Sequence, residues 1–341
     1  MNWHGAFLPM SEVRKDPVTG RSVIIVPERD KRPRQLDPRN HLARSELCPF
    51  CAGNEALTPP EVWARRDVNT QPNTPGWRVR VVPNKYPALE DRDSWTDRQD
   101  GIYESWDGLG VHQVIIESPD HLVNLDMLSE EQFADVLSAY RDRMRDLQRD
   151  SRWKYLLLYK NQGNLAGATL EHIHSQLVAL PFVPTQAIDE LRGAKMHHEL
   201  TGSCIYCDMI QPELEHGERL VSASERFVAL CPFASRFAYE TWILPKNHQA
   251  AFVESSEADI LALAGALRDV ITRLNCALAN PPFNYFIHST PVHETAGTHF
   301  HWHIEILPQL ARAAGFEWGS GSHMNSVAPE DAARLLRDVA R

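Results

Sequence analysis

Residues 167–176 read GATLEHIHSQ, and two histidines, His172 and His174, stand one residue apart near the end of this polar, glycine-containing stretch. Side chains alternate along a strand, so both imidazoles would lie on the same face. The pair could be two metal ligands, a ligand and a nucleophile, or two partly buried histidines. Residues 301–305 read HWHIE and repeat the His-x-His spacing, which indicates a fold built from a duplicated unit.

The same order of features occurs in both halves of the chain. Each half contains a Cys-x-x-Cys pair, a strand, a second strand that ends near a histidine, a long helix, a further strand and the His-x-His segment. His121 and His172 are almost as far apart in sequence as His248 and His301. The first half is longer mainly because of the polar segment 90–101, which we expect to be an inserted loop.

Two α+β units account for this order. Each is expected to be an antiparallel sheet with packed helices, with the first unit at residues 1–180, the second at 181–341 and a linker within 181–203. Apolar residues at helical spacing predict long helices over 129–150 and 255–278. Runs of β-branched and aromatic residues predict strands at 79–83, 111–117, 154–160 and 176–180.

The composition is that of a globular protein of 341 residues, with 43% hydrophobic and 23% charged residues. The net charge of −10 argues against broad binding to nucleic acid or anionic membranes, although it leaves room for a local basic pocket. The sequence has no run of about 18 apolar residues, and its N-terminus lacks the apolar core of a signal peptide. We therefore expect a cytoplasmic protein with no nucleic-acid or membrane partner.

Four of the six cysteines form two Cys-x-x-Cys pairs, which favours metal binding or redox chemistry over a disulfide framework. Zinc accepts cysteine thiolate and neutral histidine, and such a pair supplies two neighbouring corners of its tetrahedron. Each set would join three separate segments, which is typical of structural zinc. The remaining Cys231 and Cys276 are expected to be small buried residues. The two predicted zinc sites are Cys48, Cys51, His121 and His172, and Cys204, Cys207, His248 and His301.

The stretch KNQGNLAGATLEHIHSQ, residues 160–176, surrounds the first His-x-His segment with groups that can bind an anion. Its glycines allow a close backbone approach, and Asn161, Thr169 and Gln176 can donate hydrogen bonds without adding charge. No Gly-Lys-Ser/Thr follows, so this is not a Walker-type phosphate loop. Taken alone, the stretch fits a phosphate site and an ordinary Asn/Gly turn equally well.

The combination of CPFC, SPDH, KNQGNLAG and HIHSQ, with DPVTG and PERDKRP near the N-terminus, resembles the galactose-1-phosphate uridylyltransferase family. That family belongs to the histidine-triad superfamily and consists of two fused histidine-triad-like units. The resemblance runs from about residue 12 to the AGFEWG stretch and the final helix, so it covers nearly the whole chain. It implies the same two-unit fold and a homodimer.

The resemblance assigns different roles to the two histidines. The HPH-x-Q motif of the family matches residues 172–176, with isoleucine in place of proline. The match implies that His172 binds structural zinc, that His174 is the catalytic nucleophile and that Gln176 takes part in catalysis. The residues that the resemblance implies bind substrate are Arg29, Arg32, Asn84, Asn161, Gly167, Thr169 and Glu317.

The activity implied is transfer of UMP from UDP-glucose to a hexose 1-phosphate, as in galactose metabolism, through a covalent nucleotidyl-histidine in a ping-pong cycle. The Cys204–Cys207 pair departs from the best-known uridylyltransferases, whose second metal site consists of Glu and His. It is similar to the branch that includes the ADP-glucose phosphorylases, so a nucleotide-sugar phosphorylase is the alternative. A non-catalytic, zinc-dependent nucleotide-binding protein is a second alternative.

The second His-x-His segment is expected to be structural. Glu305 stands where the first segment has Gln176, and a carboxylate facing a phosphate would be repulsive. We therefore expect one catalytic centre per chain, with His301 bound to zinc and His303 a vestige or a spare metal ligand in preference to a second nucleophile.

Overall fold

The structure of the chain is a computed structural model that describes residues 11–27, 47–93, 96–294 and 296–339. Its strands are β1 (Glu12–Lys15), β2 (Ser22–Ile25), β3 (Trp63–Arg66), β4 (Trp77–Pro83), β5 (Asp97–Asp100), β6 (Tyr103–Trp106), β7 (Val111–Ile116), β8 (Tyr155–Gln162), β9 (His174–Leu180), β10 (Leu220–Ala223), β11 (Phe227–Leu230), β12 (Thr241–Pro245), β13 (Phe283–His288), β14 (His303–Pro308) and β15 (His323–Asn325). Its α-helices are α1 (Glu130–Leu147), α2 (Thr185–Thr201), α3 (Ile205–His216), α4 (Glu257–Leu278), α5 (Gly315–Ser320) and α6 (Pro329–Asp338).

Within the described residues, ten strands form one antiparallel sheet in the order β10-β11-β12-β14-β13-β8-β9-β7-β4-β3. Half of these strands come from each half of the chain, and their order in the second half mirrors that in the first. The halves meet where β8 pairs with β13, with Asn161 opposite Asn284 and Tyr159 opposite Phe286. The predicted α+β fold of two units is confirmed, and their sheets join into one, so that neither unit exposes this edge.

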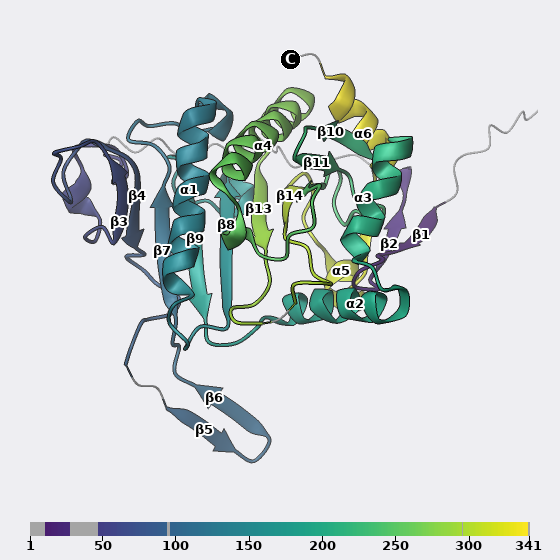
Figure 1. The fold of residues 1–341 in the computed structure, drawn as a ribbon, viewed down its shortest axis with the longest axis horizontal. Coiled ribbons are helices and arrows are strands. Elements are labelled where there is room, and N and C mark those ends of the chain that lie inside the picture. Colours follow the sequence, from purple (N-terminus) through teal and green to yellow (C-terminus); the bar gives the residue numbers. More distant parts are fainter. Residues whose placement is uncertain (1–10, 28–46, 94–95, 295, 340–341) are drawn as a thin grey trace, which may run out of the picture.

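Helices α1 and α4 pack against each other across one face of the sheet (Figure 1). Both helices were predicted, and each begins with a capping box in which Ser129 or Ser256 satisfies an N–H group of the first turn. Their apolar sides bury Phe133 of α1 and Leu267 of α4 in one core with the sheet. The opposite face of the sheet, here called the distal face, carries the polar side chains of the candidate site.

The structure adds detail to several predicted segments. The expected linker, residues 181–203, contains helix α2, which begins after Pro184 and ends at Gly202 in a left-handed conformation. The buried residues of α2 are few, so its sequence shows no clear apolar stripe. The expected inserted loop, residues 90–101, includes strand β5, which forms an exposed hairpin with β6 beyond the predicted end of the loop (Figure 1). Cys231 is buried as expected, whereas Cys276 is exposed on α4.

A small sheet, β1-β2-β15, joins the two ends of the described chain, because β2 pairs in parallel with β15. Arg14 of β1 reaches Glu330 at the start of α6, with Nη1 2.9 Å from Oε1. Helix α6 itself packs on α4 and β10. None of the helices in the described ranges is both long and apolar enough to cross a bilayer.

Candidate active site and metal centres

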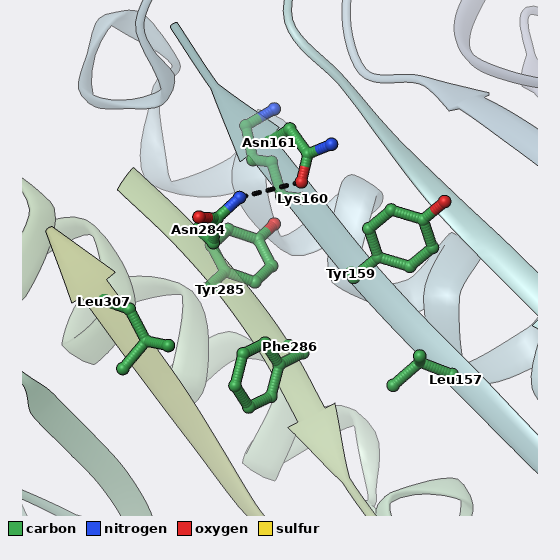
Figure 2. Close-up of a pocket in the computed structure, with 8 residues that line it drawn as sticks. All are labelled: Leu157, Tyr159, Lys160, Asn161, Asn284, Tyr285, Phe286 and Leu307. Carbon is green, nitrogen blue, oxygen red and sulfur yellow. Dashed lines mark hydrogen bonds between the residues drawn. The ribbon is translucent and has the colours of Figure 1, made fainter. Parts of the chain in front are cut away.

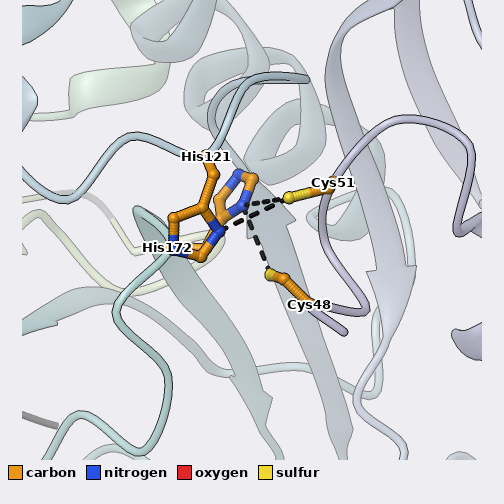
Figure 3. A group of neighbouring side chains, drawn as sticks. All are labelled: Cys48, Cys51, His121 and His172. Atoms are coloured by element: carbon orange, nitrogen blue, oxygen red, sulfur yellow. Dashed lines mark hydrogen bonds between the residues drawn. The ribbon is translucent and has the colours of Figure 1, made fainter. Parts of the chain in front are cut away.

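The first Cys-His group gathers as predicted, with the ligand atoms of Cys48, Cys51, His121 and His172 all within 4.8 Å of one another (Figure 3). His172 Nδ1 is 3.5 Å from Cys48 Sγ and 3.7 Å from Cys51 Sγ. His121 Nδ1 is 3.4 Å from Cys51 Sγ. A tetrahedral ion with Zn–S of about 2.3 Å and Zn–N of about 2.0 Å separates neighbouring S and N atoms by about 3.5 Å. The group therefore has the dimensions of a tetrahedral Cys2His2 site.

A backbone carbonyl fixes which nitrogen of His172 faces the cysteines. Its Nε2 lies 2.8 Å from the carbonyl oxygen of Ser118 and donates its proton there. The Nδ1 lone pair is then directed at the thiols, which is the tautomer that a metal ligand needs. Burial lowers the pKa of His172 to about 4, which keeps the ring neutral.

The second Cys-His group repeats this geometry. Cys207 Sγ is 3.5 Å from His248 Nδ1 and 3.6 Å from His301 Nδ1. His301 donates its Nε2–H to the carbonyl oxygen of Pro245 at 2.9 Å, as His172 does in the first group. The members of the second group, with ligand atoms within 4.8 Å of one another, are Cys204, Cys207, His248 and His301.

His174 is the first residue of β9, and its side chain is buried beside the first Cys-His group. Its Nδ1 is 2.8 Å from the carbonyl oxygen of His172, so Nδ1–H is the donor and Nε2 carries the lone pair. Burial, followed by the Lys160 ammonium, lowers the pKa of His174 and favours the neutral ring. The Phe50 ring contacts both imidazoles, which therefore lie on one side of the strand, as alternation predicts. A neutral imidazole with one free lone pair is the form that can attack phosphorus.

Gln176 follows on β9, and two donors hold its side-chain oxygen. His112 Nε2 is 2.8 Å from Oε1, and Tyr159 donates its hydroxyl to the same oxygen at 3.0 Å. The Ala88 N–H donates to His112 Nδ1 at 3.1 Å, so the His112 proton is on Nε2 and points at Gln176. Because its oxygen is engaged, Gln176 presents its NH2 group as a donor to the site. Neither partner was among the predicted site residues, although His112 is a polar residue within the predicted strand 111–117.

Asn161 lines a pocket of about 280 Å³ on the distal face, where the two halves of the chain join (Figure 2). Asn284 Nδ2 donates to Asn161 Oδ1 at 2.8 Å, so the amide of Asn161 is oriented like that of Gln176. Tyr159 lines the pocket and also contacts Gln176, which places the pocket beside the strand of His174. The residues that line it are Leu157, Tyr159, Lys160, Asn161, Asn284, Tyr285, Phe286 and Leu307.

Three other predicted substrate contacts lie near these residues. Asn84 lies beside His112, with Nδ2 3.2 Å from Nε2 of that ring, and since both atoms are donors this is proximity and not a hydrogen bond. Gly167 has a φ of 90°, a conformation that favours glycine, and a Cβ there would stand 3.5 Å from the Asn161 amide nitrogen. Thr169 is exposed in the loop before β9.

The remaining predicted contacts are Glu317, Arg29 and Arg32. Glu317 lies on the short helix α5, where its Oε2 accepts the Ala314 N–H at 2.8 Å and caps the first turn. Its predicted contact with a sugar therefore stays a prediction. Arg29 and Arg32 lie outside the described residues, and their predicted role stays untested as well.

The counterpart of His174 in the second half, His303, is enclosed by other rings. Its side chain is 0% exposed and lies between Trp242 and His288, with both ring centroids 4.9 Å away. Glu190 of α2 reaches the same cluster, with Oε2 2.7 Å from His288 Nδ1. Glu190, His288 and His303 also bring three potential ligand atoms within 4.8 Å of one another. This position is therefore filled by the protein's own side chains.

Glu305, the counterpart of Gln176, is not an isolated acid. It forms a buried ion pair with Arg236, which also binds Glu240. Burial alone would raise the pKa of Glu305, but the Arg236 guanidinium and the His288 ring hold it well below its usual range. The sequence did not show this compensation because Arg236 precedes Glu305 by 69 positions.

Comparisons with known proteins agree with this architecture. Models of the galactose-1-phosphate uridyl transferase N-terminal and C-terminal domains match residues 8–184 and 188–339. The chain is 37% identical over 336 residues to ADP-glucose phosphorylase of Arabidopsis thaliana, covering 96% of this chain and 93% of that protein. It is 31% identical over 340 residues to galactose-1-phosphate uridylyltransferase of Thermotoga maritima, covering 97% of this chain and 99% of that protein.

The fold agrees with a solved structure over the same extent. The crystal structure of an ADP-glucose phosphorylase from Arabidopsis thaliana with bound ADP-glucose matches with a TM-score of 0.84 and 35% identity, covering 97% of this chain and 99% of that one. Since the two domain models together span nearly the whole sequence, the chain belongs to the galactose-1-phosphate uridyl transferase family.

Proposed function

We propose that the chain transfers the nucleotidyl group of a nucleotide sugar to inorganic phosphate, through a covalent adduct on His174. The observation that carries the proposal is the state of that side chain. Its ring is buried, burial lowers its pKa, a carbonyl holds Nδ1–H, and Nε2 is left with the lone pair. A fixed tautomer and a single reactive nitrogen are what nucleophilic catalysis by histidine requires.

The chemistry uses groups that the structure brings together. Nε2 of His174 attacks the α-phosphorus, the bond from that phosphorus to the sugar phosphate breaks, and a sugar 1-phosphate leaves. An oxygen of inorganic phosphate then attacks the adduct, the P–N bond breaks, and a nucleoside diphosphate leaves with neutral His174 restored. The His172 carbonyl stabilises Nδ1–H while the ring carries positive charge, and the amides of Gln176 and Asn161 donate to the non-bridging oxygens.

The choice of substrates follows from the relatives. The similarity to an ADP-glucose phosphorylase is higher, at 37%, than that to a uridylyltransferase, at 31%. The pair Cys204–Cys207 also resembles the phosphorylase branch. These observations favour ADP-glucose and phosphate over UDP-glucose and a hexose 1-phosphate, the reaction that the motifs first implied. UMP transfer to a hexose 1-phosphate is the second candidate, supported by the Thermotoga maritima relative.

We assign zinc to both Cys-His groups. Two thiolates and two neutral imidazoles form a closed tetrahedral set, which is typical of structural and not of catalytic zinc. Zinc bound in the first group would fix His172 at the entrance to β9, and His174 lies two residues further on.

Mass spectrometry of the intact protein tests the reaction. The zinc-loaded chain is mixed with ADP-glucose or UDP-glucose without an acceptor, and then with phosphate or galactose 1-phosphate. We expect an AMP adduct that phosphate discharges as ADP and that is absent from His174→Gly. A UMP adduct that only the hexose 1-phosphate discharges would establish the second candidate. The absence of any adduct would leave a zinc-dependent nucleotide-binding protein.

The homodimer that the resemblance implies is part of the proposal. Phe316 and Trp318 of α5 are 39% and 80% exposed, and Glu317 lies between them. Such apolar side chains on a short helix suit a contact in which α5 approaches the site of a second copy. Light scattering after size-exclusion chromatography that gives the mass of a single chain would contradict the dimer.

A further inference from the structure

A buried polar network lies on the helix-covered side of the sheet, behind the backbone of His174. Lys160 Nζ is 2.5 Å from Glu117 Oε2 and donates to the His174 carbonyl oxygen at 2.9 Å. The side chains of Lys160 and Glu117 are both 0% exposed. The other oxygen of Glu117 accepts from the Tyr140 hydroxyl and from Ser175 Oγ, the latter at 2.5 Å. The network thus ties a buried ion pair directly to the peptide of the proposed nucleophile.

This contact occurs where the pairing of β8 with β9 stops. The register between the two strands ends at Tyr159 and Gln176, although β8 continues along β13. His174 lies two residues beyond Gln176, and the ammonium of Lys160 holds its carbonyl. In the second half, the pairing of β13 with β14 runs on to His303, the counterpart of His174. The strands therefore separate beside the proposed nucleophile, and a side chain replaces the missing backbone partner.

The second half also shows that the fold does not need this network. Phe286 and Glu305 face each other there as Tyr159 and Gln176 do in the first half, which fixes the correspondence between the strands. The correspondence between helices follows from their capping serines. Ile115 lies opposite Ser175 and Ile243 opposite Ile304, so Pro245, two residues beyond Ile243, is the counterpart of Glu117. The counterparts of Lys160, Ser175 and Tyr140 are Ile287, Ile304 and Leu267, and all four counterparts are buried.

Stability alone does not explain the polar version of this core. Removing two charges from water costs several kcal/mol per ion, so a buried ion pair is often no more stable than apolar residues of similar volume. The same unit with Ile, Pro, Ile and Leu at these positions shows that such a core is available to this fold. The core with the Lys160–Glu117 ion pair lies in the half that contains the proposed nucleophile, which indicates a role in the reaction.

We propose that Lys160 and Glu117 are positioning residues that hold the backbone of His174 where the sheet opens, and so aim its Nε2 at the phosphorus. The inference rests on the nucleotidyl transfer proposed above. Tyr285 extends the network into the second half, because its hydroxyl lies 2.7 Å from that of Tyr140. The network therefore spans the junction of the two units and rigidly supports the His174 side chain.

The test compares chemistry with binding in the double variant Lys160→Met/Glu117→Gln. This variant removes both charges together, so neither is left buried without its partner. Zinc content and thermal unfolding report the fold. The dissociation constant for ADP-glucose is measured in a His174→Gly background, and the rate of adduct formation is measured by rapid quenching. We expect binding within threefold of the parent and an adduct rate at least tenfold lower, since small displacements of a nucleophile cost up to about 100-fold.

The matched control is Ile287→Met, which places the same side chain at the counterpart of Lys160 in the second half. Ile287→Met should leave the adduct rate unchanged. Lys160→Arg should lower the adduct rate less than the double variant does, because it keeps a charged donor. An adduct rate within twofold of the parent in the folded double variant would overturn the inference. If the double variant does not fold, Lys160→Gln replaces it: its amide is too short to reach both Glu117 and the His174 carbonyl, so an unchanged rate again overturns the inference. A parent protein that forms no adduct would overturn the proposed function itself.

Discussion

Replacing His121 by alanine is expected to empty the first metal site and disable His174, whereas replacing His248 should empty the second site and leave the chemistry intact. The two residues are counterparts in the two halves. The ring of His121 packs edge-on against His172, and that of His248 against His301, with centroids 5.3 Å apart in both cases. The pair of variants therefore compares two equivalent losses at different distances from the proposed nucleophile.

The expected size of the effect follows from the ligand set. Structural zinc contributes about 10–16 kcal/mol through four ligands, or about 3–4 kcal/mol for each, so loss of one ligand weakens zinc binding by about 100- to 1,000-fold. Once zinc has left, the ring of His172 keeps its hydrogen bond to the Ser118 carbonyl, worth about 1 kcal/mol. That contact alone does not fix the entrance to β9, and we expect the adduct rate to fall by about 100-fold.

The assay measures zinc per chain by mass spectrometry under competition with a chelator, together with the rate of adduct formation. The parent should hold two zinc ions and each variant one. If His121→Ala loses its zinc and still forms the adduct at the parent rate, the metal does not position His174. If both variants lose activity equally, the effect is global, and the local role assigned to the first site is wrong.

Three further predictions concern other parts of the chain. Gln176→Glu should reduce the adduct rate by about 100- to 1,000-fold in the same quenching assay, because a donor to the phosphate becomes a negative charge; an unchanged rate would exclude Gln176 from the site. Ser129→Ala and Ser256→Ala should each lower the free energy of unfolding by about 1 kcal/mol, and by their sum when combined, as measured by urea denaturation. Although burial would raise it, hydrogen bonds from Arg14 hold the pKa of Glu330 low. The contribution of Glu330 to the free energy of unfolding is therefore present above the unfolded pKa of about 4.3 and is lost as the pH falls through the lower, folded pKa. Glu330→Gln should destabilise the protein at pH 7 and progressively less in acid.

Local patterns were sufficient for much of the fold and the site. The apolar periods identified α1 and α4 because they depend on neighbours in sequence. Both Cys-His groups were identified because the same order of cysteines and histidines occurs twice in the chain. The joining of β8 to β13 could not be predicted in this way, since the pairing of two edge strands depends on the shapes of both finished units. The partners of Gln176 and Glu305 were missed for the same reason, because His112 and Arg236 lie on distant segments.

Lys160 illustrates the limit most clearly. In sequence it is the last residue of the predicted strand 154–160 and opens the polar stretch KNQG. In the structure it is an interior residue of β8 whose charge is matched by Glu117, a residue of another segment. A sequence pattern reports polarity at one position and not whether a partner of opposite charge will be buried beside it.

Around the paired strands β8–β9 and β13–β14, the two halves place their buried charges on opposite faces of the sheet. In the first half the charges lie on the helix-covered face. The distal face therefore keeps neutral donors, such as Asn161 and Gln176, that can bind an anion. In the second half the equivalent positions of the distal face are His288 and Glu305, and Arg236 neutralises the carboxylate there. Duplication thus preserved the fold while only one half kept a face suited to a phosphate.

This division predicts that one substitution will not create a second reactive centre. Glu305→Gln restores the residue type of the first half, but Arg236 would keep Glu240 as its partner, and His303 would remain between Trp242 and His288. We therefore expect no adduct on His303 when Glu305→Gln is combined with His174→Gly. An adduct on His303 would show that Glu305, and not the enclosure of the His303 ring, keeps the second half unreactive.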